Sequence, residues 1–204
     1  MKQVNVKIWS DFVCPWCWIA KRRFEKAVMA LENQVEVVVT LKAYRLARGM
    51  APMDFKETLY TKFGNSAAAE GMMAAVAKAG VTEGLQYNFD TMRFGDTTAA
   101  HVLVKSIQSS ADRQRMIEGI YRGVTTDGLN IFDSNVLLAL ANELGVSAPF
   151  DLESRELASE IARDEIEASQ VANGVPLFVF NDKFFVSGAR EVANFEATPA
   201  KGVD

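Results

Sequence analysis

Residues 11–17 read Asp-Phe-Val-Cys-Pro-Trp-Cys and mark the point where a strand pattern turns into a helix pattern. Upstream, apolar residues stand at every second position of residues 4–8, which is typical of a half-buried strand. Downstream, residues 15–32 carry an apolar stripe at helical spacing. Pro15 suits a first helical position, because the N–H that proline lacks would be unpaired there. The two cysteines therefore lie at a strand–helix junction.

A second strand and a late hairpin complete the predicted sheet. Residues 35–41 are rich in β-branched side chains, so the chain opens with a βαβ unit whose strands we expect to be parallel. The strand pattern returns at residues 177–180 and, after a turn at 181–182, at 184–186. Between residues 45 and 172 the sequence shows helical periodicity and no convincing strand. The helices expected there cover residues 55–63, 67–79, 97–109, 112–123, 134–144 and 152–171.

These elements predict an α/β domain that is split in sequence by a helical insertion. We expect one domain from residues 1–44 plus 160–204, and an inserted all-helical domain from residues 45–159. A strand that runs into a C-x-x-C pair at a helix start is a thioredoxin-like arrangement. Residues 197–204 are small and polar, and we expect them to fray.

Composition limits the functional classes. The chain has 204 residues, 49% of them hydrophobic, and a net charge of −4 from 22 basic and 26 acidic side chains. Without a basic excess, nucleic acid and anionic membrane are poor candidates as main partners. No apolar run is long enough to span a bilayer, and the N-terminus shows no export signal. We therefore expect a cytoplasmic protein of unassigned oligomeric state.

The spacing of Cys14 and Cys17 favours redox chemistry. Cys14 is expected at the N-terminus of the helix, where unpaired N–H groups and the helix dipole stabilise a thiolate. Cys17 lies on the same helical face one turn deeper, within reach of a disulfide. The first thiol would attack a substrate and the second would resolve the product. A metal site is the weaker interpretation, because structural zinc needs four ligands and the chain adds one histidine, His101.

Three further residues near the pair are candidates for support of the active site. Asp11 either exchanges a proton with Cys17 or moderates the Cys14 thiolate, or else it is a turn or capping residue that links strand to helix. Pro15 and Trp16 separate the two thiols. Trp16 is a candidate for an apolar wall against the substrate.

The segment Gly174-Val175-Pro176 directly precedes the returning strand. Read alone it is a turn, and most X–Pro bonds in folded proteins are trans. In a redox domain, however, a cis Pro176 facing the C-x-x-C would leave the Val175 backbone free to pair with an extended substrate chain.

Together these motifs resemble the DsbA-like oxidoreductases. Residues 11–17, residues 174–179 and the following Val-Ser-Gly-Ala at 186–189 are similar to the cytoplasmic FrnE-type branch, described as dithiol–disulfide isomerases of polyketide biosynthesis. Residues 96–101 are similar to an Asn-Thr-x-x-Ala-His signature of that branch. The resemblance implies a thioredoxin fold with an inserted helical domain, and a cis Pro176 opposite Cys14.

The chain departs from this pattern at three places. Asp96 stands where the signature has Asn, and Arg190 stands where Gln is usual. The segment after Arg190 has Val192 and Phe195 as its larger apolar residues, so we expect the closing helix of the family to be short or poorly anchored. His101 either overhangs the thiols or is a helix-interior histidine with a satisfied hydrogen bond.

The sequence thus predicts a thiol–disulfide oxidoreductase without a prosthetic group. The reaction would proceed through a mixed disulfide between Cys14 and a protein or small-molecule substrate, resolved by Cys17. One alternative is a glutathione-dependent isomerase or transferase on the same scaffold, with glutathione as co-substrate. Another is a peptide-binding module without redox turnover.

Overall fold

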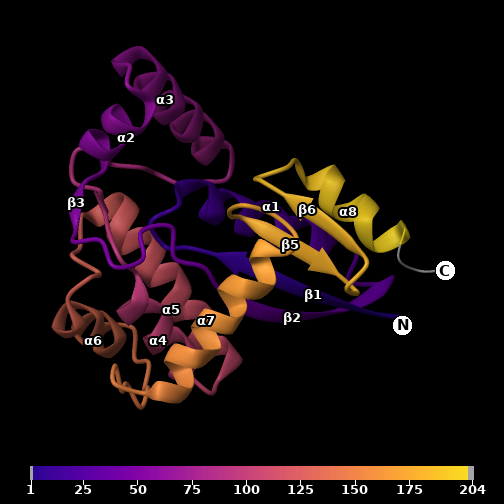
Figure 1. Cartoon of the computed structure of the whole chain (residues 1–204). Helices are drawn as coiled ribbons and strands as arrows, with labels where there is room; N and C mark the ends of the chain where they lie inside the picture. The colour runs from indigo at the N-terminus through magenta and orange to yellow at the C-terminus, as the bar shows by residue number, and fades with distance from the viewer. Residues whose placement is uncertain (1, 202–204) are drawn as a thin grey trace. The chain divides into compact units, whose positions relative to one another are not determined.

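A four-stranded sheet in the order β2-β1-β5-β6 organises one part of the chain in the computed structural model, which describes residues 2–201 (Figure 1). Its strands are β1 (Lys2–Ser10), β2 (Val35–Ala43), β5 (Leu177–Phe180) and β6 (Phe184–Ser187). β1 and β2 are parallel. β5 is antiparallel to both β1 and β6, with Ile8 opposite Phe178. The predicted α/β class, the parallel opening pair and the C-terminal hairpin are confirmed.

Two units share the chain, one formed by Met1–Tyr44 with Ala162–Asp204 and the other by Arg45–Ile161. The first contains the sheet, α1 (Pro15–Ala30), α8 (Val192–Lys201) and the second half of α7 (Arg155–Ser169). The second contains α2 (Phe55–Phe63), α3 (Ser66–Thr82), α4 (Thr98–Ser106), α5 (Ser110–Arg122) and α6 (Ser134–Glu143). Among residues 2–201, no helix has the length and apolar character needed to cross a membrane.

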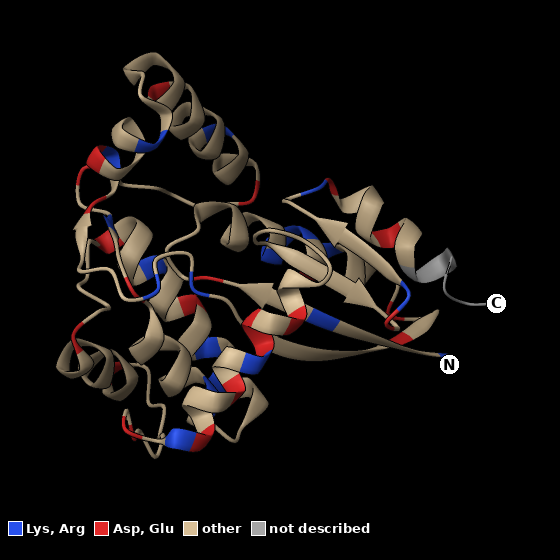
Figure 2. Cartoon of the chain, viewed as in Figure 1, with Lys and Arg blue, Asp and Glu red and all other residues tan. Residues whose placement is uncertain are grey.

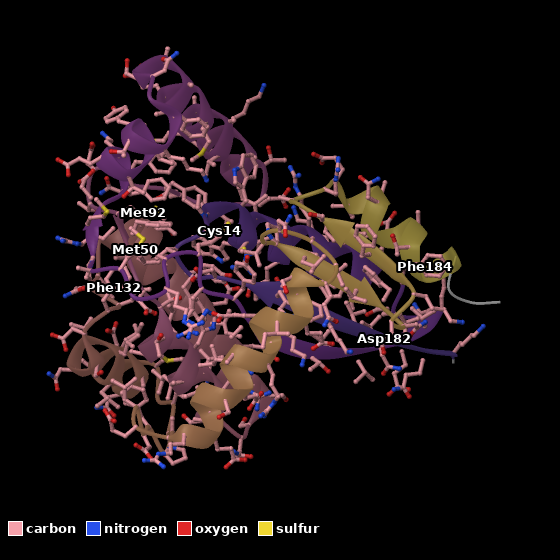
Figure 3. The ribbon with its side chains drawn as sticks, in the orientation of Figure 1. Cys14, Met50, Met92, Phe132, Asp182 and Phe184 are labelled. Atoms are coloured by element: carbon pink, nitrogen blue, oxygen red, sulfur yellow. The ribbon has the colours of Figure 1, made fainter. Side chains whose placement is uncertain are left out.

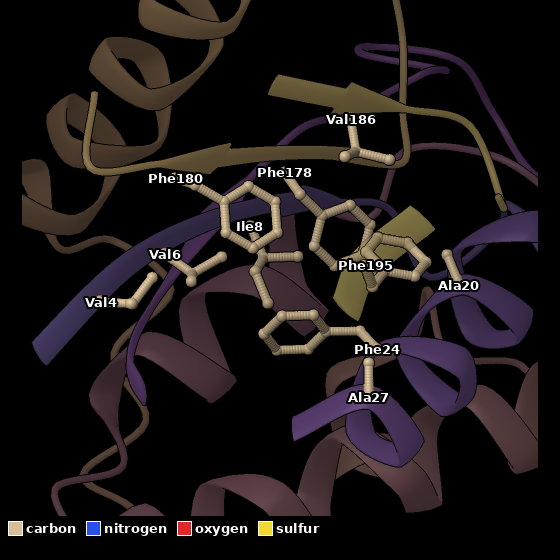
Figure 4. Packing of buried hydrophobic residues seen from close by; sticks show 10 residues of the cluster. All are labelled: Val4, Val6, Ile8, Ala20, Phe24, Ala27, Phe178, Phe180, Val186 and Phe195. Carbon is tan, nitrogen blue, oxygen red and sulfur yellow. The ribbon is translucent and has the colours of Figure 1, made fainter. Parts of the chain in front are cut away.

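The alternation along β1 explains how the first unit is layered. Its even-numbered apolar residues belong to a core shared with α1, α8 and the hairpin, shown in Figure 4. The members of this cluster are Val4, Val6, Ile8, Ala20, Phe24, Ala27, Phe178, Phe180, Val186 and Phe195. On the other face, Trp9 packs with Leu177 and Val179 against Ala168 of α7. Successive side chains of a strand point to opposite faces, so one strand supports both layers.

The second unit contains two short strands that periodicity did not predict. β3 (Met53–Asp54) and β4 (Arg93–Phe94) pair antiparallel. Two residues are too few to show an alternating pattern, so the expectation that this region has no strand was wrong. After Arg122 the backbone also changes to a π-helix, η1 (Gly123–Asp127), where an α-helix was expected to end.

The C-terminal helix is longer and better anchored than its composition indicated. Phe195 is 1% exposed, and its ring centroid lies 4.7 Å from that of Phe178 and 5.9 Å from that of Phe24. One large aromatic side chain in the core thus fixes a helix of otherwise small residues. The expectations of a poorly anchored closing helix and of fraying from residue 197 were therefore wrong as far as residue 201. Residues 202–204 lie outside the described part.

Candidate active site

Cys14 is the N-cap residue of α1, and Pro15 occupies the first turn. The backbone at Cys14 is extended (φ −95°, ψ 106°), and its N–H donates to the carbonyl of Asp11 at 3.1 Å. The Cys17 N–H in turn donates to the Cys14 carbonyl at 3.0 Å. This turn explains why the chain leaves β1 and enters α1 within four residues. It also places the first thiol where the helix dipole favours negative charge.

The two thiols are free and both are buried, with Cys14 7% and Cys17 2% exposed. Burial raises the pKa of Cys17 well above its ordinary value, and a hydrogen bond with Cys14 raises it further. A backbone hydrogen bond with Asp11 acts to lower this pKa, and the negative charge of the Asp11 side chain, which is itself fully buried, acts to raise it. At neutral pH Cys17 is therefore held as a neutral thiol, with an acid close to it.

The Val175–Pro176 segment faces the first cysteine. The Cys14 thiol donates to the Val175 carbonyl, with 3.8 Å between Sγ and the oxygen. The Val175–Pro176 bond is cis, which confirms what the resemblance implied. The N–H of Gly188, after β6, donates to the Pro176 carbonyl at 2.9 Å. The structure thus brings together residues that lie 161 positions apart in sequence.

The remaining predicted site residues have different surroundings. Trp16, which directly precedes Cys17 in the sequence, is half-buried, and Pro15 is buried. His101 belongs to the other unit, on α4, where it is 5% exposed and its N–H donates to the Thr97 carbonyl. Its role in catalysis stays a prediction. Figure 3 labels Cys14 near the start of α1 and Asp182 at the opposite end of the sheet, in the β5–β6 turn.

Asp96 makes polar contacts although it departs from the family signature. Its carboxylate accepts hydrogen bonds from the Gly49 N–H at 2.6 Å and from the N–H and hydroxyl of Thr98 at 2.8 and 2.5 Å. Arg45 donates to the same hydroxyl at 2.8 Å. Burial acts to raise the pKa of Asp96, but these hydrogen bonds and Arg45 lower it overall. The acid therefore joins the 45–50 loop to the start of α4.

Sequence reasoning missed Arg23, which is 6% exposed on α1. It stands three residues after Ala20 and four before Ala27, both buried, so it lies on the buried stripe of the helix. The sequence feature that could have revealed Arg23 is a permanently charged side chain on the apolar stripe of a helix, because arginine is seldom fully buried without a partner. Among the described residues, no group of three or more His, Cys, Asp or Glu side chains is placed to hold a metal ion.

The sequence matches the description "DSBA-like thioredoxin domain" over residues 5–198. The chain belongs to this family. At the family level it is therefore a DsbA-like thiol–disulfide oxidoreductase. A comparison with curated protein sequences gives no match.

This DsbA-like chain is also similar to proteins of known structure. A probable DsbA oxidoreductase from Streptomyces coelicolor is 31% identical, with a TM-score of 0.86 over 98% of this chain and 91% of that one. The cytosolic disulfide reductase DsbM from Pseudomonas aeruginosa, in a structure with GSH, is 17% identical, with a TM-score of 0.62 over 97% and 94%. A 2-hydroxychromene-2-carboxylate isomerase is 13% identical, with a TM-score of 0.70 over 97% and 95%. At 17% and 13% identity, the similarity to the last two structures shows a shared fold alone.

Proposed function

We propose that the protein exchanges disulfides through Cys14, with Cys17 as the resolving thiol. The observation that supports this most directly is the placing of the Cys14 thiol at the start of α1, beside the Val175 carbonyl and above a second buried thiol. The thiolate of Cys14 attacks a substrate disulfide, forms a mixed disulfide and releases one substrate thiolate. Cys17 then attacks Cys14 Sγ, closes the Cys14–Cys17 disulfide and releases the second thiolate. The substrate gains two electrons and the enzyme loses two.

Resolution requires that Cys17 lose its proton, because the thiolate is the attacking species. The raised pKa of Cys17 keeps this thiol unreactive until a mixed disulfide has formed beside it. Asp11 is the acid closest in the chain and interacts with Cys17 electrostatically, so we assign it as the acceptor of that proton.

The substrate is held, in this proposal, by backbone pairing with Val175 next to Pro176. The Val175 carbonyl lies within 3.8 Å of the attacking sulfur, so a chain paired there would present its disulfide to Cys14. Half-buried Trp16 supplies an apolar contact beside it. A protein substrate with an extended segment suits this arrangement better than an isolated thiol.

The cellular setting is part of the proposal. Similarity in fold to the cytosolic reductase DsbM and the FrnE-type motifs support a cytoplasmic location, with no bound prosthetic group and glutathione as a co-substrate that returns the pair to its reduced state. A glutathione-dependent isomerase and a binding module without turnover are the alternatives. Isomerisation of substrate disulfides would use the same first step without closing the Cys14–Cys17 bond.

The test is reduction of insulin by dithiothreitol, with and without the protein. We expect the wild-type chain to accelerate precipitation of the insulin B chain, and Cys14→Ser to abolish the effect. With insulin alone, in the absence of dithiothreitol, reduced Cys17→Ser should attack and then accumulate as a mixed disulfide, detected by mass spectrometry as a mass increase that later addition of dithiothreitol reverses. A wild-type protein that leaves the insulin rate unchanged would be a binding module or a glutathione-dependent isomerase instead.

A further inference from the structure

Arg23 brings a charge to the buried side of α1, nine residues after Cys14. An arginine cannot be deprotonated inside a protein, and burial of its charge is unfavourable without partners. Its partners therefore decide what this residue does.

Arg23 contacts residues 188–191, the corner between β6 and α8. Its Nη1 donates to the Ala189 carbonyl at 2.8 Å and lies 2.9 Å from a carboxylate oxygen of Glu191. The Glu191 side chain is 74% exposed, and an ion pair with such a partner contributes little. The carbonyl contact is the one that fixes the backbone of the corner.

The same corner holds the segment that faces the reactive sulfur. Gly188, directly before Ala189, donates its N–H to the Pro176 carbonyl at 2.9 Å. Pro176 follows Val175, whose carbonyl accepts from the Cys14 thiol. The contacts thus run from α1 through the corner and the Val175–Pro176 segment back to the N-cap of α1.

We propose that Arg23 is a positioning residue for disulfide exchange, because it holds the corner that keeps the Val175 carbonyl beside Cys14. This inference rests on the function proposed above. A substrate chain paired with Val175 presents its disulfide correctly only while that carbonyl keeps its place. A shift of ~1 Å in such an alignment can slow a reaction by up to ~100-fold. A small disulfide without a peptide backbone does not use the pairing and should not sense the shift.

The fold itself has other anchors, so Arg23 can be tested. α1 is held to the sheet by the aromatic and aliphatic core around Phe24, and Ala189 and Val192 pack against the same core. Loss of the guanidinium therefore removes one hydrogen bond that holds the corner, without removing the apolar contacts of the helix.

The experiment compares two probes on the reduced protein by stopped-flow tryptophan fluorescence: insulin, and hydroxyethyl disulfide. We expect Arg23→Met to lower the rate constant for insulin by about tenfold and to leave that for hydroxyethyl disulfide unchanged. Arg23→Lys keeps a charged donor but not the planar fork, and should fall between wild type and Arg23→Met.

Two matched controls isolate the carbonyl contact. Arg22→Met removes the neighbouring charge, which pairs with Glu25 within α1, and Glu191→Gln removes the exposed ion pair only. Both should keep the wild-type ratio of the two rates. If urea unfolding shows that Arg23→Met does not fold, Arg23→Lys provides the same comparison of rates.

Equal slowing with both probes, or no slowing with insulin, would overturn the role of Arg23 while the proposed exchange activity stands. A wild-type chain that reacts with neither probe would overturn the proposed function, and this inference with it.

Discussion

At the scale of single residues, the two cysteines differ in chemistry because they differ in position on one helix. We predict that Cys17→Ser, which leaves Cys14, is alkylated by iodoacetamide much faster at neutral pH than Cys14→Ser, which leaves Cys17. The labelling rate of Cys17 should still rise as the pH passes 9.0, because burial raises the pKa of this thiol above that ordinary value. Mass spectrometry of timed samples measures both rates. Similar rates for the two variants would contradict the assigned roles.

Asp96 provides a second prediction for a single side chain. Asn can supply one acceptor oxygen where the carboxylate supplies two, so Asp96→Asn loses at least one hydrogen bond in the 45–50 loop. We expect a loss of about 1–2 kcal/mol in the free energy of unfolding at pH 7. Because the folded pKa is lowered, the stabilisation by the charge is complete above the ordinary value of 3.8 and is lost as the pH falls through the folded pKa.

Urea unfolding of wild type and Asp96→Asn at neutral and acid pH checks this. The difference between the two proteins should shrink below pH 3.8. A difference that stays constant into acid would show that the carboxylate acts through packing and not through its charge.

At the scale of elements, α7 is fastened to the sheet by acidic side chains that pair with lysines of the strands, and Figure 2 shows red acidic segments along this helix. Lys42 pairs with Asp164 at 2.9 Å and with Glu167 at 3.1 Å, and Lys7 pairs with Glu167 at 2.8 Å. Asp164 is 1% exposed, and its Oδ2 accepts from the Ala43 N–H at 3.0 Å. The helix is therefore tied to β1 and to the end of β2 by side chains from both strands.

We predict that Asp164→Asn lowers the free energy of unfolding by about 3 kcal/mol, because it leaves the Lys42 ammonium without its buried counter-charge. The exposed Glu156→Gln on the same helix is the control and should change little. Burial acts to raise the pKa of Glu167, but hydrogen bonds from Lys7 and Lys42 lower it overall, so its share of the stability is present above its ordinary value of 4.5 and is lost in acid. Urea unfolding at pH 7 measures the difference. Equal stabilities of the two variants would show that the charge of Asp164 does not stabilise the attachment of α7 to the sheet.

Elements with a long pattern or a clear cap were predictable from sequence. α2 has the expected bounds, Phe55–Phe63, because Asp54 caps its start and Gly64, at φ 60°, ends it. β3, β4 and η1 were not predicted, because strands of two residues and a π-helix of five residues are too short to show a periodic pattern of apolar side chains. The cysteine pair and Val175–Pro176 form local motifs, so the sequence alone could single them out as candidates. Arg23 and Asp164 act through contacts 166 and 121 residues away, which no local pattern records.

At the scale of the whole molecule, the insertion leaves and re-enters the first unit at neighbouring points. The chain crosses between units at Tyr44–Arg45 and again at Ile161–Ala162. Asp164, just after the second crossing, bonds the backbone of Ala43, just before the first. A long helical insertion can therefore be accommodated without separating β2 from α7.

The redox state of the pair should change the stability of the whole protein. A thiolate at the start of α1 is stabilised by the helix terminus in the folded chain and not in the unfolded one, so folding favours the reduced form. The buried charge of Asp11 opposes this. We therefore predict a potential between the ~−270 mV of thioredoxin and the ~−120 mV of DsbA, an interval of roughly 7 kcal/mol.

Two measurements must agree on this prediction, because they are linked by one thermodynamic cycle. Equilibration in glutathione buffers, followed by tryptophan fluorescence, gives the potential of the pair, and urea unfolding of each form gives the two stabilities. The reduced protein should be the more stable, by ~1.4 kcal/mol for each ~30 mV by which its potential exceeds that of the unfolded dithiol. An oxidised form that is equally or more stable, with a potential at or below that of thioredoxin, would show that Asp11 outweighs the helix terminus. The Cys14–Cys17 dithiol would then be at least as strong a reductant as that of thioredoxin.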